Sequence, residues 1–317
     1  MDPVSQAALG AACSQVFLFR QDKKNAWLIG ALAGMAADLD ILIRSSSDPM
    51  LIFIYHRHFT HSLAFIPIGG LLVALALLPF KRFRTRWLLT LSAALIGYAT
   101  HGILDAMTSY GTVLFWPFSN CRIAWDLLPI IDPFVTVPLV CGVLWTQLFA
   151  DLKGVLLALG FMGLLLMFNG WQHHRAITAV EAYGRQQHWH LTRIRAFPEI
   201  ASSTHWYAAA HHNQQIFLAA VHTSPFSSSK VYALGLFPAF AAKDMPVYLS
   251  ETGKLSRDLR VFNWFTDGYL IVACRQPFTV ADARYITGNP VYSLWGIQLR
   301  PNRTHAEMRH SIPLKGC

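Results

Sequence analysis

The chain has 317 residues, of which 54% are hydrophobic and 14% charged, against about 25% charged in an ordinary soluble domain. This surplus of apolar surface excludes an ordinary water-soluble protein and indicates one whose solvent is partly lipid. The net charge of +9 comes from basic residues between apolar stretches, with no basic run interleaved with aromatic residues. We therefore expect anionic membrane lipids as partners and no nucleic acid.

The residues before position 171 are predicted to form an all-α polytopic membrane domain, residues 1–170. Two apolar segments open it: Val4–Arg20, whose small residues suit tight helix packing, and Asn25–Ile43, which ends in two aspartates. Four more stretches reach or approach the roughly 20 residues that span a bilayer. They are Leu63–Phe80, Trp87–Leu104, Leu127–Phe149 and Val155–Gly170.

Basic residues set the expected orientation, because short loops rich in Lys and Arg stay in the cytoplasm. Lys81, Arg82, Arg84 and Arg86 form such a loop. With this loop inside, His61, Asp105 and residues 175–317 face the periplasm. The sequence thus predicts a bacterial inner-membrane protein whose polar clusters and tail both lie on the periplasmic side.

Residues 171–317 differ in composition, since they hold all four Glu and 15 of the 26 Lys and Arg residues. A polar helix over 171–190 is expected to lead into a small β-rich (α+β) soluble domain, whose protein partner the sequence does not indicate. Asp267-Gly268 predicts a hairpin turn between Val261–Thr266 and Tyr269–Cys274. The strand-like runs include Trp206–Ala210, Ile216–Val221, Val231–Leu236 and Val261–Phe265, the last of which is the first strand of this hairpin.

Three clusters in the first domain carry chemistry. They are Asp38 with Asp40, the run His56-Arg57-His58-Phe59-Thr60-His61, and the pair His101 and Asp105, which share one helix face at i and i+4. The predicted topology places all three on one side of the membrane. Imidazole and carboxylate ligands suit zinc or manganese, whereas the five cysteines have no metal-site spacing.

Simpler explanations exist for each cluster alone. An HxxxD pair is common as a hydrogen-bonded pair on a helix. Asp38 and Asp40 would also serve to cap the next segment or to pair with Arg44, and the histidines would also suit an interfacial loop that meets lipid phosphates through Arg57. The metal site is favoured because the clusters coincide, and because a divalent cation offsets the cost of several carboxylates at a membrane.

The blocks GALAGMAADLD, HRHFTHSL and THGILDAMTSYGTVLFWPFSNCRIAWDLLPIIDP, with the opening MDPVSQAALGAA, resemble the bacterial inner-membrane metal-dependent hydrolase family of the YdjM type. The resemblance covers about residues 1–150. It implies a multi-helix membrane enzyme with Asp38 or Asp40, His61, His101 and Asp105 as ligands. Many members have Thr-His near the start, where this chain has Ser5-Gln6.

The chain is also distantly similar to zinc-dependent phospholipase C, an all-helical enzyme in which an HxxxD aspartate bridges two ions. His101 and Asp105 match that pair. The later HxxxE of the phospholipases has no counterpart in residues 106–170, which contain neither His nor Glu. We therefore expect one or two divalent metal ions, zinc or manganese.

Together these features predict a membrane-bound metal-dependent hydrolase that uses an activated water on a lipid-derived or phosphoester substrate. The general base would be Asp38, Asp40 or a histidine, His56 or His58 would protonate the leaving group, and Arg57 would bind an anionic group. Transport is disfavoured because the polar residues lie at one end of the helices. The remaining alternative is a non-catalytic, metal-stabilised membrane scaffold whose C-terminal domain binds a partner.

Overall fold

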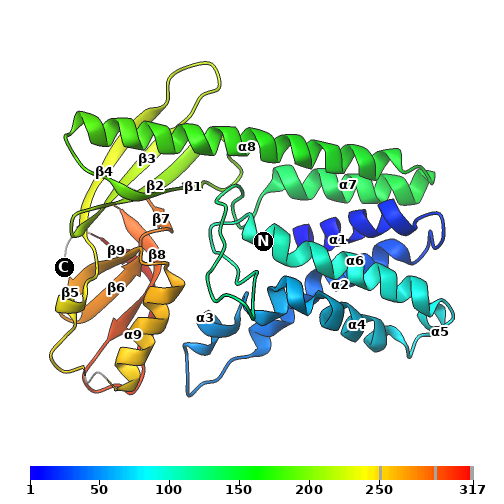
Figure 1. Ribbon diagram of the computed structural model, residues 1–317, viewed down its shortest axis with the longest axis horizontal. Helices are drawn as coiled ribbons and strands as arrows, with labels where there is room; N and C mark the ends of the chain where they lie inside the picture. The colour runs from blue at the N-terminus through cyan, green and yellow to red at the C-terminus, as the bar shows by residue number, and fades with distance from the viewer. Residues whose placement is uncertain (250–251, 289–290, 315–317) are drawn as a thin grey trace. The chain divides into compact units, whose positions relative to one another are not determined.

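The computed structural model describes residues 1–249, 252–288 and 291–314 (Figure 1). The chain divides into two compact units. The helical unit comprises Met1–Leu42 and Tyr55–Gly170, and the C-terminal unit comprises Ile43–Ile54 and Trp171–Cys317. The sequence placed residues 43–54 with the membrane half, whereas in the structure they pack with the C-terminal unit.

The helical unit consists of α-helices joined by short 3₁₀ turns. Its first helix begins where Asp2 caps the backbone N–H groups of Val4 and Ser5 and Pro3 occupies the first turn. The helices are α1 (Pro3–Leu18), α2 (Ala26–Ala36), α4 (Ile66–Leu77), α5 (Lys81–Arg84), α6 (Trp87–Ala106), α7 (Pro133–Phe149) and the first half of α8 (Lys153–Gln186). The turns are η1 (Ala37–Leu42), η2 (Phe59–His61) and η3 (Leu63–Phe65).

Glycines bring the backbones of α1, α2 and α6 into contact. A Cβ atom at Gly30 would lie 2.4 Å from the carbonyl oxygen of Gly10, and one at Gly97 would lie 2.4 Å from that of Gly30. Small residues at such positions allow the close helix packing that is common in membranes. The three helices therefore form a tight group, and α6 among them carries His101 and Asp105.

The number of helices able to span a membrane is smaller than the four expected. Within the described residues, two helices are long and apolar enough, α6 and α8, or three if the pair Leu51–His61 and Leu63–Leu77, bent by 61°, forms one span. The predicted stretch Leu127–Phe149 is helical only from Pro133, because Asp132 caps α7 and Pro133 starts it. Apolar composition alone did not reveal these breaks.

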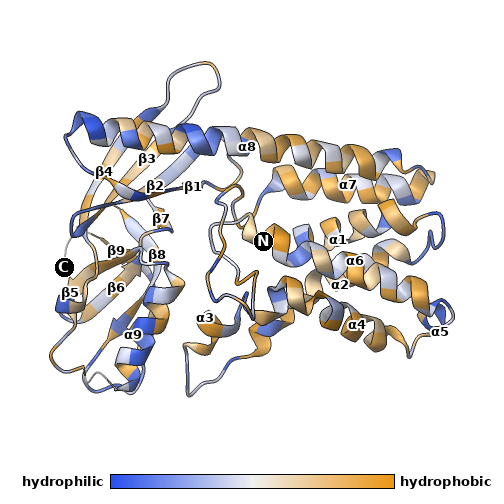
Figure 2. Ribbon diagram, viewed as in Figure 1, coloured by the Kyte–Doolittle hydropathy of each residue, from blue (hydrophilic) through white to orange (hydrophobic). Residues whose placement is uncertain are grey.

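Helix α8 runs without interruption through the predicted boundary at residue 170. Its hydropathy changes from hydrophobic to hydrophilic along its length (Figure 2). One 34-residue helix thus contains the predicted span Val155–Gly170 and most of the predicted polar helix 171–190, which ends at Gln186. The chain passes from the helical unit to the C-terminal unit inside a regular helix.

The described part of the C-terminal unit contains two antiparallel sheets together with helix α9 and the second half of α8, as the α+β prediction required. The first sheet has the strand order β1-β2-β3-β4. The second sheet has the strand order β5-β6-β8-β7, and β9 also pairs with β8. The strands are β1 (Thr192–Pro198), β2 (His205–His212), β3 (Gln215–His222), β4 (Lys230–Pro238), β5 (Leu270–Arg275), β6 (Phe278–Asp282), β7 (Ile286–Thr287), β8 (Tyr292–Leu299) and β9 (Glu307–Pro313), with helix α9 (Lys254–Phe265) between β4 and β5.

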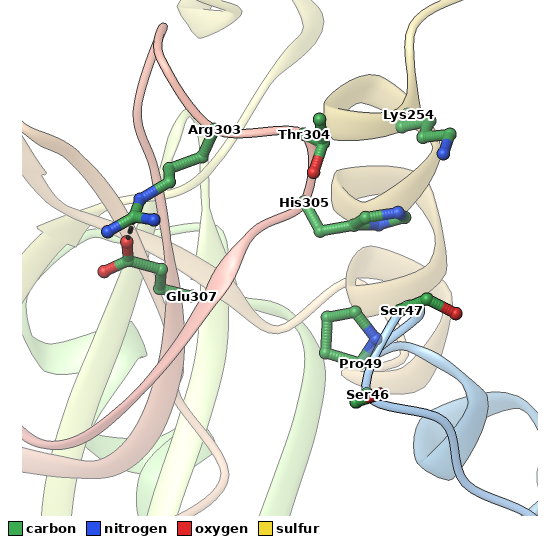
Figure 3. Close-up of a pocket in the computed structure, with 8 residues that line it drawn as sticks. All are labelled: Ser46, Ser47, Pro49, Lys254, Arg303, Thr304, His305 and Glu307. Atoms are coloured by element: carbon green, nitrogen blue, oxygen red, sulfur yellow. Dashed lines mark ion pairs between the residues drawn. The ribbon is translucent and has the colours of Figure 1, made fainter.

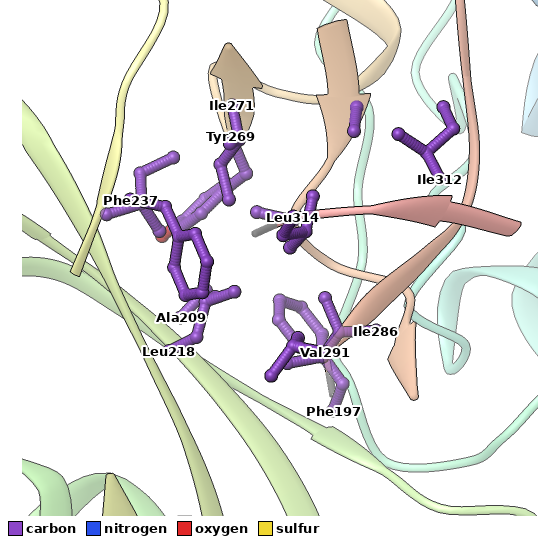
Figure 4. Close-up of a cluster of buried hydrophobic side chains, with 13 residues drawn as sticks. Phe197, Ala209, Leu218, Phe237, Tyr269, Ile271, Ile286, Val291, Ile312 and Leu314 are labelled. Carbon is purple, nitrogen blue, oxygen red and sulfur yellow. The ribbon is translucent and has the colours of Figure 1, made fainter. Parts of the chain in front are cut away.

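Each face of the first sheet contributes to a hydrophobic cluster. Successive side chains on a strand point to opposite faces, so one strand supplies residues to both clusters. Ile216 and Leu218 of β3 join the core shared with the second sheet (Figure 4). Phe217 of the same strand packs on the other face with Ala176 and Val180 of α8. The predicted strands Trp206–Ala210, Ile216–Val221 and Val231–Leu236 are confirmed within β2, β3 and β4.

The predicted strand Val261–Phe265 and the hairpin after it are wrong. These residues end the amphipathic helix α9, whose buried positions Asp258, Leu259, Phe262 and Phe265 follow helical spacing. Asp267 and Gly268 both have positive φ, as a hairpin turn requires, but here they terminate the helix before β5. The prediction of positive φ at Asp267 and Gly268 was correct, but the element before them is a helix and not a strand.

Segment 43–54 is held in the C-terminal unit by aromatic packing and an ion pair. The ring of Phe53 lies 5.3 Å from that of Phe262 and 4.7 Å from that of Phe265. Asp48 Oδ2 lies 2.7 Å from a terminal nitrogen of Arg257. Helix α3 (Leu51–Tyr55) then leads the chain back toward the helical unit.

Candidate metal centre

Four potential metal ligands from three segments of the helical unit meet at one point. Asp38 lies in η1, His61 ends η2, and His101 and Asp105 lie one turn apart near the end of α6. One nitrogen or oxygen atom from each lies within 4.8 Å of the others. The side chains of His61, His101 and Asp105 are fully buried, whereas that of Asp38 is 23% exposed. Any opening of the site therefore lies beside Asp38.

Five of the six distances between the donor atoms are close to those of a tetrahedral zinc site, and the sixth, between Asp38 and Asp105, is below 4.8 Å. His61 Nε2 lies 2.9 Å from His101 Nε2 and 3.3 Å from both Asp38 Oδ1 and Asp105 Oδ2. His101 Nε2 lies 3.4 and 3.5 Å from the same two oxygens. Four tetrahedral ligands bonded to zinc at about 2.0 Å lie about 3.3 Å apart. The five distances from the two imidazole nitrogens thus suit a single zinc ion bound between the four side chains.

One buried oxygen of this group lacks a hydrogen bond. Among the described residues, no group donates an aligned hydrogen bond to Asp105 Oδ2. Arg57 Nε lies 3.1 Å away without such alignment. A buried carboxylate oxygen left in this state is unfavourable, and a cation bound between the four ligands would satisfy it.

Neighbouring groups fix which nitrogen of each histidine faces the centre. His101 Nδ1 lies 2.5 Å from the Gly34 carbonyl oxygen, so the Nδ1–H donates there and Nε2 keeps its lone pair. His61 Nδ1 lies 3.2 Å from Asp40 Oδ2, and Thr60 Oγ1 donates to the same oxygen at 2.9 Å. Such acceptors behind a histidine are typical of metal-binding imidazoles.

Asp40 belongs to a second group of potential ligands, Asp38, Asp40 and His56. His56 Nδ1 lies 2.8 Å from Asp40 Oδ1. Burial alone would raise the pKa of the Asp40 carboxyl, but hydrogen bonds with His56 and His61 lower it well below its ordinary value. Asp38 is common to both groups, so the residues present fit one ion, or two ions that share Asp38.

The three predicted catalytic residues lie in different surroundings. His56 pairs with Asp40 at the edge of the site. Arg57 is buried, and its guanidinium faces Asp105 Oδ2 and donates to Thr108 Oγ1 at 2.8 Å. His58 lies among aromatic rings, 6.1 Å from the ring of Trp116, and joins neither ligand group among the described residues.

Two features of the site were missed in the sequence. Gln6 Nε2 donates to Asp105 Oδ1 at 2.9 Å, so the residue that replaces histidine in Ser5-Gln6 still reaches the site. Gly102 lies between two ligand segments, since a Cβ atom there would lie 2.1 Å from the His61 carbonyl oxygen. Gln6 stands where many family members have histidine, and this was the available signal. Nothing in the local sequence marked Gly102.

A pocket lies within the C-terminal unit (Figure 3). It has a volume of about 460 Å³ and is lined by residues that include Lys254, Arg303 and His305. Nearby Asp48, Asp258 and His305 have ligand-like spacing. Arg257 already supplies a positive charge there, 2.7 Å from Asp48 and 3.8 Å from Asp258, so this group is an ion-pair network.

A helical region with candidate membrane spans and a buried His/Asp centre, followed by a two-sheet domain, defines a membrane protein with a potential metal site. Residues 1–176 match the model of the family described as YdjM inner membrane protein. This match covers more than half of the chain, which therefore belongs to the YdjM inner membrane protein family. The family resemblance seen in the sequence is confirmed.

A curated relative is similar over a shorter region. The uncharacterized protein YfhP of Bacillus subtilis (strain 168) is 31% identical over 117 residues, which are 36% of this chain and 34% of YfhP. The match thus spans about a third of the length of this relative. No solved structure matches the chain.

Proposed function

We propose that this protein is a membrane-bound metal-dependent hydrolase whose substrate is a lipid-derived molecule or another phosphoester. The observation that carries the proposal is the convergence of Asp38, His61, His101 and Asp105, whose donor atoms all lie within 4.8 Å of one another and of which three are fully buried. Two imidazoles and two carboxylates favour zinc, with manganese as the alternative. The partial exposure of Asp38 supports access from one side.

Each residue has a distinct role in this proposal. A bound divalent ion would polarise the scissile group and lower the pKa of a water molecule. His56, with Nδ1 held by Asp40, keeps Nε2 for proton transfer to the leaving group. Asp40 also orients His61, and Arg57 holds Asp105, so we assign Arg57 a positioning role. His58 has no role beyond packing here.

The proposed location of the centre is the periplasmic side of the inner membrane. His101 and Asp105 lie at the end of α6 opposite the basic segment that includes α5, whose Lys and Arg residues favour the cytoplasm. If α7, a 17-residue apolar helix, crosses the bilayer between α6 and α8, the C-terminal unit would lie in the periplasm as well. A lipid headgroup or a lipid-linked phosphate is available at the periplasmic surface of the bilayer.

The second candidate is a metal-stabilised scaffold without catalysis. The complete burial of His61, His101 and Asp105 favours it, because structural sites are closed whereas catalytic sites keep an open ligand position. The two functions share the ion and differ only in turnover.

The experiment is metal analysis of detergent-purified full-length protein by mass spectrometry, followed by assay against phosphoester and lipid probes. We expect about one equivalent of zinc or manganese, or two if the second group is filled, and loss of most of it in His101→Ala and Asp105→Ala. The exposed histidine of α8 provides the matched control, His174→Ala, which should keep its metal. Protein that neither carries nor takes up metal would refute the proposal. Metal without any hydrolysis would favour the scaffold.

A further inference from the structure

Exposed apolar side chains border the candidate centre on η1. Asp38 and Asp40 point inward, whereas Leu39 is 64% exposed and Leu42 is 67% exposed on the same short turn. A soluble enzyme would place polar residues at such positions, because large exposed apolar groups in water favour association. The turn that supplies the carboxylates therefore also presents a hydrophobic edge.

The segment between α6 and α7 provides a second hydrophobic edge. It packs on the histidine run: the ring of Tyr110 lies 5.6 Å from that of His56, and the Leu63 N–H donates to the Leu114 carbonyl oxygen at 3.0 Å. The same segment exposes Phe115 and, at 91%, Phe118. Apolar rings so near the end of a candidate span suit the bilayer interface.

We propose that Leu39, Leu42, Phe115 and Phe118 form an apolar rim that lies in the bilayer interface and admits a lipid substrate laterally from the membrane. Its acyl chains would stay against the rim while its polar group reaches Asp38 and His56. The substrate class is then an amphiphile with a long hydrocarbon chain. Its hydrolysis rests on the proposed function, whereas contact of the rim with lipid does not.

The first experiment tests this contact by photocrosslinking. p-Benzoylphenylalanine replaces Phe118 in the full-length protein, which is placed in nanodiscs of phosphatidylethanolamine and phosphatidylglycerol and irradiated. Phe226 of the C-terminal unit is the matched control, since it is a phenylalanine exposed to 96%. We expect lipid adducts, seen by intact mass, at position 118 and few at position 226.

The following results would contradict the proposal that the rim lies in the bilayer interface. Equal lipid adducts at both positions, or none at position 118, would show that Phe118 does not lie in the bilayer. Crosslinks from position 118 to a second protein chain would instead make this surface a protein interface. Neither result depends on catalysis, so failure of the hydrolase proposal leaves this test intact.

The second experiment separates lateral entry from a general effect on activity. The double variant Leu42→Ser and Phe118→Ser is compared with wild type on two phosphomonoesters, fluorescent phosphatidic acid in vesicles and water-soluble 4-nitrophenyl phosphate. Loss of two apolar contacts should reduce cleavage of the vesicle lipid by about tenfold or more, with the soluble probe and the metal content unchanged. An equal fall on both probes would refute lateral entry. If wild type cleaves neither probe, the hydrolase proposal fails and lateral entry to a reaction fails with it.

Discussion

Gly102→Ala should damage the candidate centre without altering a single ligand. Gly102 follows His101 on α6, and an added Cβ would lie 2.1 Å from the carbonyl oxygen of His61, where ordinary contacts begin at 3.4 Å. The obstacle is backbone, which cannot rotate away as a side chain can. Helix α6 and the His61 segment must therefore separate by up to about 1.3 Å.

The separation is large compared with what a metal site tolerates. Ligand distances in real sites stay within about 0.2 Å of their ideal values, and His61 and His101 supply both nitrogens of the set. We expect a shift of this size to lower the metal affinity at least as much as the loss of a residue that hydrogen-bonds to a ligand. Such a loss lowers metal affinity on the order of 10–100-fold. Alanine is also the better helix former by about 1 kcal/mol, so weaker intrinsic helix formation cannot explain the loss.

The assay is competitive zinc titration of detergent-purified protein against a chromophoric chelator, with circular dichroism to check helix content. Gly163→Ala in α8 is the matched control, because no heavy atom lies within 4 Å of a Cβ at that position. We expect a drop of about 100-fold for Gly102→Ala and none for Gly163→Ala. Wild-type zinc affinity in Gly102→Ala would refute the proposed geometry.

Other predictions address the support of the site, the C-terminal unit and the topology. Asp40→Asn removes the charge behind His61 and should lower zinc affinity by about 10–100-fold in the same titration; unchanged affinity would exclude Asp40 from this role. Arg284→Ala leaves the carboxylate of Asp282, 2.7 Å from the Arg284 guanidinium, buried without its partner, and should cost about 3–5 kcal/mol in thermal denaturation of the full chain, whereas an unchanged melting temperature would contradict it. In a cysteine-free background, Leu255→Cys should react with an impermeant maleimide without opening the inner membrane; reaction only after opening would reverse the topology.

Much of the centre was predictable because its signals are local. His101 and Asp105 share a helix face by spacing alone, and the two aspartates end an apolar helix where charge needs a partner. The choice between Asp38 and Asp40 was not predictable, because it depends on how η1 turns. In the structure Asp38 faces His61 Nε2 while Asp40 faces His61 Nδ1. Gly34 acts through its backbone carbonyl, which no residue pattern reveals.

The fold was predicted where burial follows a simple period and was missed where tertiary contacts decide. Three strands of the first sheet were found from their apolar runs. Val261–Phe265 is rich in β-branched and aromatic residues, yet it forms helix because Phe262 and Phe265 pack against Phe53, nearly 210 residues earlier in the chain. The helical spacing of the buried positions in 254–265 was visible in the sequence, whereas the partner Phe53 was not.

The placement of segment 43–54 means that the two units are interleaved along the chain rather than consecutive. The backbone crosses between them at 42/43, 54/55 and 170/171. A fragment ending at residue 170 would keep Phe53 but lose Phe262 and Phe265, so truncation of the tail exposes an aromatic side chain that is 5% exposed in the whole protein. The ends of this segment lie three residues after Asp40 and two before His56. Deletion of the tail is therefore no neutral way to isolate the membrane half.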